Sequence, residues 1–231
     1  MENYLLNKYQ FTMYGKQIDI YPNSRPDCPI VYLNTFSDEG GGIYKILREM
    51  GCKYFTLVAI SSLEWNNDMP PWDIPPVLKD DTPFTGGADK YLKILTGKII
   101  PETEKHIQGS ISWRAITGYS LAGLFAVYSI YHTDIFTRAA SVSGSFWFPG
   151  FKEYVFSHKI MIHPGCIYLS LGNTESKTKN PYLKTVQENT EAIFEFYKNK
   201  GIDTIFQLNQ GSHFKDIARR MATGIKWILE K

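Results

Sequence analysis

The sequence predicts an α/β protein in which one open, mostly parallel sheet is covered by helices on both faces. Short, continuous apolar runs of strand length recur along the chain, and such runs are typical of strands buried on both faces. Segments with apolar residues at helical spacing separate them, so strands and helices alternate, as right-handed parallel crossovers require. We expect residues 1–231 to form a single domain.

The first third of the chain is expected to form a hairpin followed by a strand–helix–strand unit. Residues 11–21 alternate in polarity around a central turn, which is the pattern of a β-hairpin. Residues 29–34 and 54–60 are predicted to be buried strands, with a helix over the apolar positions from Ile43 to Met50. The run Gly40–Gly42 is interpreted as a flexible turn, because it fits neither glycine pattern of nucleotide-binding sites.

Residues 61–87 interrupt the alternation of strands and helices. Five prolines prevent a regular helix there, and Trp65 and Trp72 add large aromatic faces. A long irregular segment within one domain is usually either functional or disordered, and tryptophans favour an ordered, functional segment. We therefore expect this loop to lie near the active site, with both tryptophans contacting the substrate.

The remaining two thirds of the chain repeat the strand and helix pattern. The expected helices cover residues 88–107, 121–131, about 186–197 and 217–228, and the expected strands cover residues 114–117, 138–142, 166–171 and 204–208. Pro101 is expected to kink the first of these helices.

Composition excludes several classes of function. A formal net charge of +2 without any Lys/Arg cluster argues against nucleic-acid binding, which needs a basic patch to displace counterions. No apolar run is long enough for a membrane span, and the first residues do not have the pattern of a signal peptide, so we expect a cytoplasmic protein. The sequence gives no indication of the oligomeric state.

Neither the cysteines nor the histidines predict a metal or a cofactor. Cys28, Cys52 and Cys166 are widely spaced and lie at or just before apolar runs, so we expect buried structural thiols. His158 and His163 are five residues apart, a poor spacing for shared metal ligation on a helix.

The segment Gly118–Gly123 has the pattern of a nucleophile elbow, G-x-S-x-G, with Ala122 in place of the second glycine. A buried strand ends just before this segment and an apolar helix follows it, so Ser120 would stand on a sharp strand-to-helix turn. Small residues are needed there because the strand and the helix approach closely. The alternative is an ordinary turn with a serine cap.

A serine hydroxyl needs a base to become nucleophilic, and His213 has the appropriate place in the chain. Of the five histidines, only His213 follows a predicted strand on a loop before the last helix. The chain order serine, acid, histidine then places the acid after the strand over residues 166–171, where Glu175 is the candidate. Asp203 is the rival by residue type, but it stands at the opposite edge of the sheet. A Ser–His dyad without an acid is also open.

The same edge of the sheet supplies candidates for the oxyanion hole and for substrate contacts. The backbone N–H of Leu121, directly after Ser120, is one expected donor, and Thr35 or Phe36 is the other. The stretch Ser143–Trp147 ends another strand there, so Ser143, Ser145 and Trp147 are candidate substrate contacts. A tryptophan packed at the rim is as good an interpretation of Trp147.

These residues resemble the putative-esterase family of α/β hydrolases, which includes esterase D, feruloyl and acetyl-xylan esterases, siderophore esterases and mycolyltransferases. Gly118–Gly123, Ser143–Trp147 and Gly211–His213 carry the likeness, and the Trp65–Trp72 loop is similar to loops of uncharacterised bacterial members. The resemblance implies an α/β-hydrolase fold and ester hydrolysis without metal or organic cofactor. It also implies Ser120 as nucleophile and His213 as base.

The predicted function is hydrolysis of a small-molecule carboxylic ester through an acyl-enzyme on Ser120. Two alternatives remain open from sequence. Acyl transfer to an alcohol would use the same residues, and a non-catalytic binding protein could keep the same scaffold. The acyl group and the alcohol are not predicted.

Overall fold

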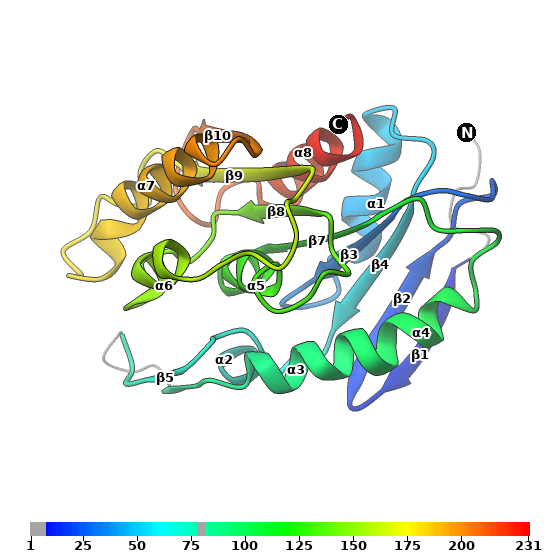
Figure 1. The fold of residues 1–231 in the computed structure, drawn as a ribbon, viewed down its shortest axis with the longest axis horizontal. Helices are drawn as coiled ribbons and strands as arrows, with labels where there is room; N and C mark the ends of the chain where they lie inside the picture. Colours follow the sequence, from blue (N-terminus) through cyan, green and yellow to red (C-terminus); the bar gives the residue numbers. More distant parts are fainter. Residues whose placement is uncertain (1–7, 78–81) are drawn as a thin grey trace.

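The computed structural model describes residues 8–77 and 82–231, and in this part of the chain eight strands form one sheet (Figure 1). Their order is β1-β2-β4-β3-β7-β8-β9-β10. The strands are β1 (Tyr9–Met13), β2 (Lys16–Tyr21), β3 (Ile30–Asn34), β4 (Thr56–Ser61), β7 (Arg114–Tyr119), β8 (Arg138–Val142), β9 (Cys166–Gly172) and β10 (Asp203–Asn209). β1 and β2 form the expected antiparallel hairpin, β2 pairs antiparallel with β4, and all other pairs are parallel. The prediction of a mostly parallel sheet is confirmed.

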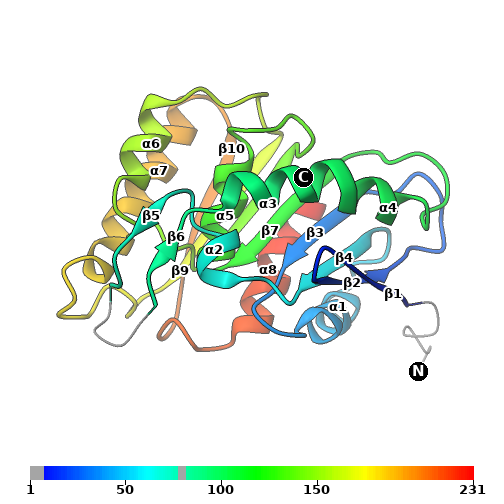
Figure 2. The same cartoon turned by 90° about the horizontal axis from the view of Figure 1, so that it is seen from below.

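Helices cover both faces of this sheet, as predicted (Figures 1 and 2). One face carries α1 (Gly40–Glu49) and α8 (Ile217–Leu229), and the other carries α3 (Ala88–Ile94), α4 (Ile100–Glu104), α5 (Leu121–Ser129), α6 (Phe151–Ser157) and α7 (Val186–Asn199). Each face has its own apolar core. Within residues 8–77 and 82–231, no helix is both long and apolar enough to cross a bilayer.

The central helix α5 is buried on every side, which accounts for its uniformly apolar sequence. It packs against β7 and β8 and starts directly after Ser120. The parallel register brings the carboxyl ends of the neighbouring strands to one edge: Asn34 of β3 is level with Gly118 of β7, and Val142 of β8 is level with Ser170 of β9. The loops that follow these strands therefore meet at that edge.

The triple glycine is the first turn of α1, so its interpretation as a flexible turn was wrong. The reason is a close approach between this helix and the sheet. A Cβ added to Gly40 would lie 2.3 Å from the Cβ of Ala59 on β4, a distance that real atoms do not adopt. Packing thus requires glycine at Gly40. The helix begins nearer the N-terminus than its apolar residues, which start at Ile43, indicate.

The helix over residues 88–107 is interrupted by a π-helical turn, Leu95–Ile99, rather than by a kink at Pro101. Proline lacks a backbone N–H and its ring clashes with the carbonyl four residues earlier in an α-helix. The wider turn directly before α4 changes that spacing, and Pro101 then stands in the first turn of α4, where its missing N–H costs little.

The segment over residues 61–87 is mostly irregular, as predicted, and contains one helical turn and a short ladder. The turn is α2 (Trp65–Asp68), and β5 (Asp73–Ile74) pairs antiparallel with β6 (Phe84–Thr85). Residues 78–81 lie outside the described part of the chain. Helix α6 was not expected from sequence, because the glycine- and aromatic-rich stretch before it shows no helical spacing.

The three cysteines are buried, as expected. Burial raises the pKa of Cys166 to about 11, so its thiol stays protonated at neutral pH. Such a thiol is a poor nucleophile and a poor metal ligand.

A buried ion pair connects the 61–87 segment to the sheet. Lys16 at the start of β2 is 5% exposed and Asp68 at the end of α2 is 6% exposed, and the ammonium group donates to Asp68 Oδ2. The same carboxylate oxygen accepts the Glu64 backbone N–H at 2.8 Å. Because each charge is out of water, each depends on the other for compensation. Trp65 lies inside this anchored turn.

Replacing Lys16 by Met should therefore lower the free energy of unfolding by about 3 kcal/mol, because it leaves the Asp68 carboxylate buried and unpaired. Adding Asp68→Asn removes that charge and keeps an acceptor for Glu64 N–H, so the double variant should be more stable than Lys16→Met alone. Urea denaturation of the three proteins measures both steps. A Lys16→Met protein as stable as the wild type would contradict this role.

Candidate active site

Ser120 stands at the turn between β7 and α5 in a backbone conformation that is rare for serine, with φ 58° and ψ −122°. Such a conformation costs about 1–3 kcal/mol and persists where the surroundings impose it. The close approach of strand and helix imposes it here: a Cβ added to Gly118 would lie 2.4 Å from the Cβ of Ala122. The methyl group of Ala122 therefore fits against Gly118, and the second glycine of the elbow pattern is not needed.

His213 and Glu175 form a hydrogen-bonded pair at the same edge of the sheet. The distance between His213 Nδ1 and Glu175 Oε2 is 2.7 Å. Glu175 follows β9 and its side chain is 4% exposed, while the His213 side chain, on the loop between β10 and α8, is 28% exposed. Asp203, the rival acid, begins β10 at the opposite edge and pairs with Lys231 at 3.0 Å. The structure thus brings Glu175, not Asp203, to the imidazole.

Several donors converge on the second oxygen of the Glu175 carboxylate. Oε1 accepts the Gly172 backbone N–H at 2.5 Å and the Ser143 hydroxyl at 2.8 Å, and the guanidinium of Arg220 lies 3.4 Å away. Burial raises the pKa of Glu175, but the hydrogen bonds from His213, Gly172 and Ser143 lower it by a larger amount. The net result is a pKa below its usual value. Glu175 is therefore ionised at neutral pH and able to stabilise an imidazolium.

Arg220 and Tyr119 hold the loop that carries His213. Arg220, buried on α8, donates to the backbone carbonyls of Gln210 at 2.9 Å and Ser212 at 3.1 Å. The Tyr119 hydroxyl donates to the carbonyl of His213 itself at 2.5 Å. One arginine thus contacts both the carboxylate and the loop of its histidine partner. Sequence reasoning missed both residues, because an arginine on an amphipathic helix has the pattern of a solvated charge.

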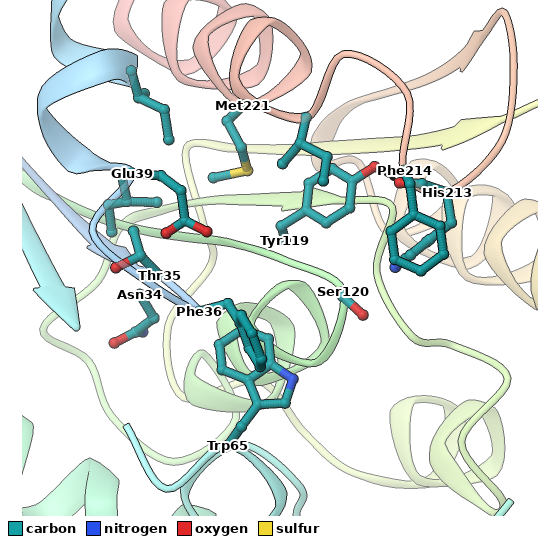
Figure 3. A pocket seen from close by; sticks show the side chains of 13 residues that line it. Asn34, Thr35, Phe36, Glu39, Trp65, Tyr119, Ser120, His213, Phe214 and Met221 are labelled. Atoms are coloured by element: carbon teal, nitrogen blue, oxygen red, sulfur yellow. Dashed lines mark hydrogen bonds between the residues drawn. The ribbon is translucent and has the colours of Figure 1, made fainter. Parts of the chain in front are cut away.

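Ser120 and His213 line a pocket of about 450 Å³ (Figure 3). This size is in the range of small-molecule sites. Most of its lining side chains are apolar or aromatic, and the full set is Leu33, Asn34, Thr35, Phe36, Glu39, Ile43, Trp65, Tyr119, Ser120, His213, Phe214, Ile217 and Met221. Phe214, directly after the histidine, is 82% exposed and stands at the mouth of the pocket.

The Ser120 hydroxyl forms a hydrogen bond with the hydroxyl of Ser145 at 3.2 Å. Ser145 follows β8 and is itself fixed, because its backbone N–H donates to the Ser120 carbonyl at 3.1 Å. Catalytic hydrogen bonds are often looser in the absence of substrate. A rotation about the Cα–Cβ bond of Ser120 would turn the hydroxyl away from Ser145.

Backbone hydrogen bonds show which of the two candidate oxyanion donors after β3, Thr35 or Phe36, is available. The N–H of Thr35 donates to the Ile60 carbonyl at 2.9 Å, so it extends the sheet and is engaged. Phe36 is the next residue and lines the pocket, which makes it the better candidate. Leu121 is the first residue of α5, so its N–H has no acceptor within the helix.

Apart from Ser145, the predicted substrate contacts are Trp65, Trp72, Ser143 and Trp147, and these four differ in position. Trp65 lines the pocket and packs edge-on against Phe36, with ring centroids 5.1 Å apart. The structure places the other three elsewhere. Trp72 donates its indole N–H to the Pro149 carbonyl at 3.0 Å and packs on α6. Trp147 packs against Phe84. Ser143 is buried and donates its hydroxyl to Glu175. Ser143 therefore supports the acid, and the two tryptophans connect the 61–87 segment to the region around α6.

Among the residues that the structure describes, no three His, Cys, Asp or Glu side chains gather as a metal site requires.

A family model described as "Putative esterase" matches residues 39–215. The chain belongs to the putative esterase family. The match contains the elbow at Ser120, Glu175 and His213. A curated relative, the uncharacterized protein YbbA of Bacillus subtilis (strain 168), is 23% identical over 225 residues, which cover 91% of this chain and 89% of YbbA.

Solved structures show that the fold is the α/β-hydrolase fold. The siderophore hydrolase EstA from Aspergillus nidulans superposes with a TM-score of 0.72 at 18% identity, covering 97% of this chain and 94% of EstA. An IroE-like serine hydrolase from Shewanella oneidensis gives a TM-score of 0.77 at 14% identity, covering 97% of this chain and 80% of that protein. At these identities the likeness extends to the fold alone.

Arg220→Met should lower kcat for p-nitrophenyl butyrate by roughly 10- to 100-fold with a smaller change in KM, because a displaced imidazole misaligns the reacting atoms. Arg220→Lys keeps the charge and should recover part of kcat, which a purely structural defect would not predict. Arg219→Met, an exposed neighbour on the same helix, is the matched control. Unchanged kcat in a folded Arg220→Met protein would contradict a positioning role.

Trp65→Ala and Trp72→Ala should have different effects. Trp65→Ala should change the ratio of kcat/KM for p-nitrophenyl acetate and butyrate, because it removes a wall of the pocket. Trp72→Ala should keep that ratio and instead lower the free energy of unfolding by about 3 kcal/mol, through lost packing. Steady-state kinetics and urea denaturation of both variants distinguish the two roles. A changed ratio in Trp72→Ala alone would reverse the assignment.

Proposed function

We propose that this protein is a serine esterase that hydrolyses a carboxylic ester through an acyl-enzyme on Ser120. The observation that carries the proposal is the 2.7 Å hydrogen bond between His213 and a buried, ionised Glu175, at the pocket that also contains Ser120. A carboxylate in this position fixes the imidazole tautomer with the proton on Nδ1, so that Nε2 is free to accept a proton.

In the first half of the reaction, Ser120 Oγ attacks the carbonyl carbon of the ester while His213 Nε2 takes the hydroxyl proton. The carbonyl oxygen becomes an oxyanion, which the backbone N–H groups of Leu121 and Phe36 stabilise. When the tetrahedral intermediate collapses, the bond to the alcohol oxygen breaks and that oxygen leaves with the proton from Nε2. The product is an ester between the acyl group and Ser120.

In the second half, water repeats the sequence. His213 takes a proton from water, the resulting hydroxide attacks the acyl carbon, and Ser120 Oγ leaves with the proton from Nε2. Each half of the reaction returns the imidazole to neutrality, so Glu175 alternately faces a neutral and a cationic ring. The hydrogen bonds that hold Glu175 ionised keep this cation stabilised without moving the carboxylate.

The elbow geometry supports the same proposal. Ser120 adopts a strained conformation for which a simple capping serine has no need, and it makes no side-chain cap of α5. A non-catalytic scaffold has no reason to maintain this strain together with a buried acid–imidazole pair. We therefore favour catalysis over simple binding.

Ser120→Ala should abolish both hydrolysis of p-nitrophenyl butyrate and labelling by a fluorophosphonate, because both require the serine oxygen. Glu175→Gln should lower kcat by about 10³- to 10⁴-fold, since the amide favours the wrong imidazole tautomer. Rates and labelling are measured on the same folded preparations, with the wild type as reference. A wild-type protein that neither turns over nor labels would refute the esterase proposal.

A further inference from the structure

Glu39 stands out among the residues that line the pocket. It is the sole carboxylate among the lining residues that the structure describes, and most of the other lining residues are apolar or aromatic, such as Leu33, Ile43 and Met221. Figure 3 shows its carboxylate directed into the pocket, across from Ser120 and His213. The reaction proposed above makes no use of this charge.

The local structure does not account for the orientation of Glu39. It is the N-cap residue of α1, yet its side chain makes no capping hydrogen bond to that helix. Its Oε2 accepts the Ser37 backbone N–H at 3.0 Å. In the described part of the chain, no lysine or arginine forms an ion pair with Glu39. A carboxylate has about four acceptor positions, so most of its capacity faces the pocket.

We propose that Glu39 recognises a positively charged group of the substrate, so that the preferred esters are those carrying an ammonium group. This inference rests on the proposed esterase function and names the class of ester.

Desolvation makes the charge of the substrate decisive. When a ligand fills the pocket it removes water from the Glu39 carboxylate, and an unpaired charge in apolar surroundings is costly. A neutral ester leaves that cost uncompensated and an anionic ester adds repulsion. An ammonium group offsets it by electrostatic attraction to the carboxylate, which is stronger in a pocket without water than in bulk solvent.

The aromatic side chains beside Glu39 also suit a cation. Phe36 and Trp65 line the same pocket, below Glu39 and Ser120 in the view of Figure 3, and their rings meet edge-on with centroids 5.1 Å apart. Ring faces attract ammonium groups, most strongly when both are out of water. An acid next to two aromatic rings is thus a pocket that distinguishes a trimethylammonium group from an uncharged tert-butyl group of the same shape.

Two pairs of isosteric substrates test the inference on both halves of the ester. On the acyl side, the p-nitrophenyl ester of 4-(trimethylammonio)butanoate is compared with that of 5,5-dimethylhexanoate. On the alcohol side, acetylthiocholine is compared with S-(3,3-dimethylbutyl) thioacetate, with the released thiol measured colorimetrically. For at least one pair, we expect kcat/KM of the wild type to favour the cation by about tenfold, the order of one carboxylate–cation attraction reinforced by a cation–π contact.

Glu39→Gln keeps the shape and removes the charge, so the preference for the cation should fall to near one in this variant. Asp38→Asn is the matched control. Asp38 directly precedes Glu39, its carboxylate is exposed, and it does not line the pocket. It should leave the preference unchanged, which separates direct contact from a general negative field.

The outcomes distinguish the two proposals. If the wild type hydrolyses neither member of either pair, the esterase function itself fails. If it hydrolyses them without preferring the cation, or if the preference persists in Glu39→Gln, the role of Glu39 is refuted and the esterase function stands.

Discussion

The Glu175 carboxylate is the contact on which the geometry of the site depends. Its donors come from separate parts of the fold: Ser143 after β8, Gly172 at the end of β9, His213 after β10 and Arg220 on α8. Because it is buried and ionised, each donor offsets part of the cost of removing the charge from water. The parallel register alone brings strand ends to one edge, but this carboxylate fixes how the loops beyond them sit relative to one another.

The parts of the site that sequence could predict are those with a local pattern. Ser120 stands between a strand and a helix that both have clear apolar signatures, and the turn itself requires small residues. His213 was found by elimination, since no other histidine follows a strand. Glu175 was placed by chain order alone. In each case the residue follows a parallel strand, and all residues in such positions lie at the same edge of the sheet. The order of strands along the chain is therefore enough to predict that they meet.

The parts that sequence could not predict depend on contacts between distant segments. Arg220 lies seven residues after His213, and nothing in the last helix marks it as buried beneath the loop. Glycine is needed at Gly40 because Ala59, a residue on the strand β4, leaves no room for a Cβ there. Trp65 and Trp72 look equivalent in one proline-rich loop, yet only Trp65 lines the pocket, because the buried contact between Lys16 and Asp68 anchors the turn that carries it.

Two carboxylates, Glu175 hydrogen-bonded to His213 and Glu39 in the lining of the pocket, illustrate how surroundings decide the role of a residue type. Glu175 is 4% exposed and meets donors on both oxygens, so its charge is already compensated and its position is fixed. Glu39 meets one backbone N–H and faces apolar walls. A charge compensated within the protein can orient an imidazole without attracting a ligand, whereas a charge left open toward a pocket is compensated when a cation enters. In the function proposed here, the same functional group would orient the catalytic imidazole in one place and select the substrate in the other.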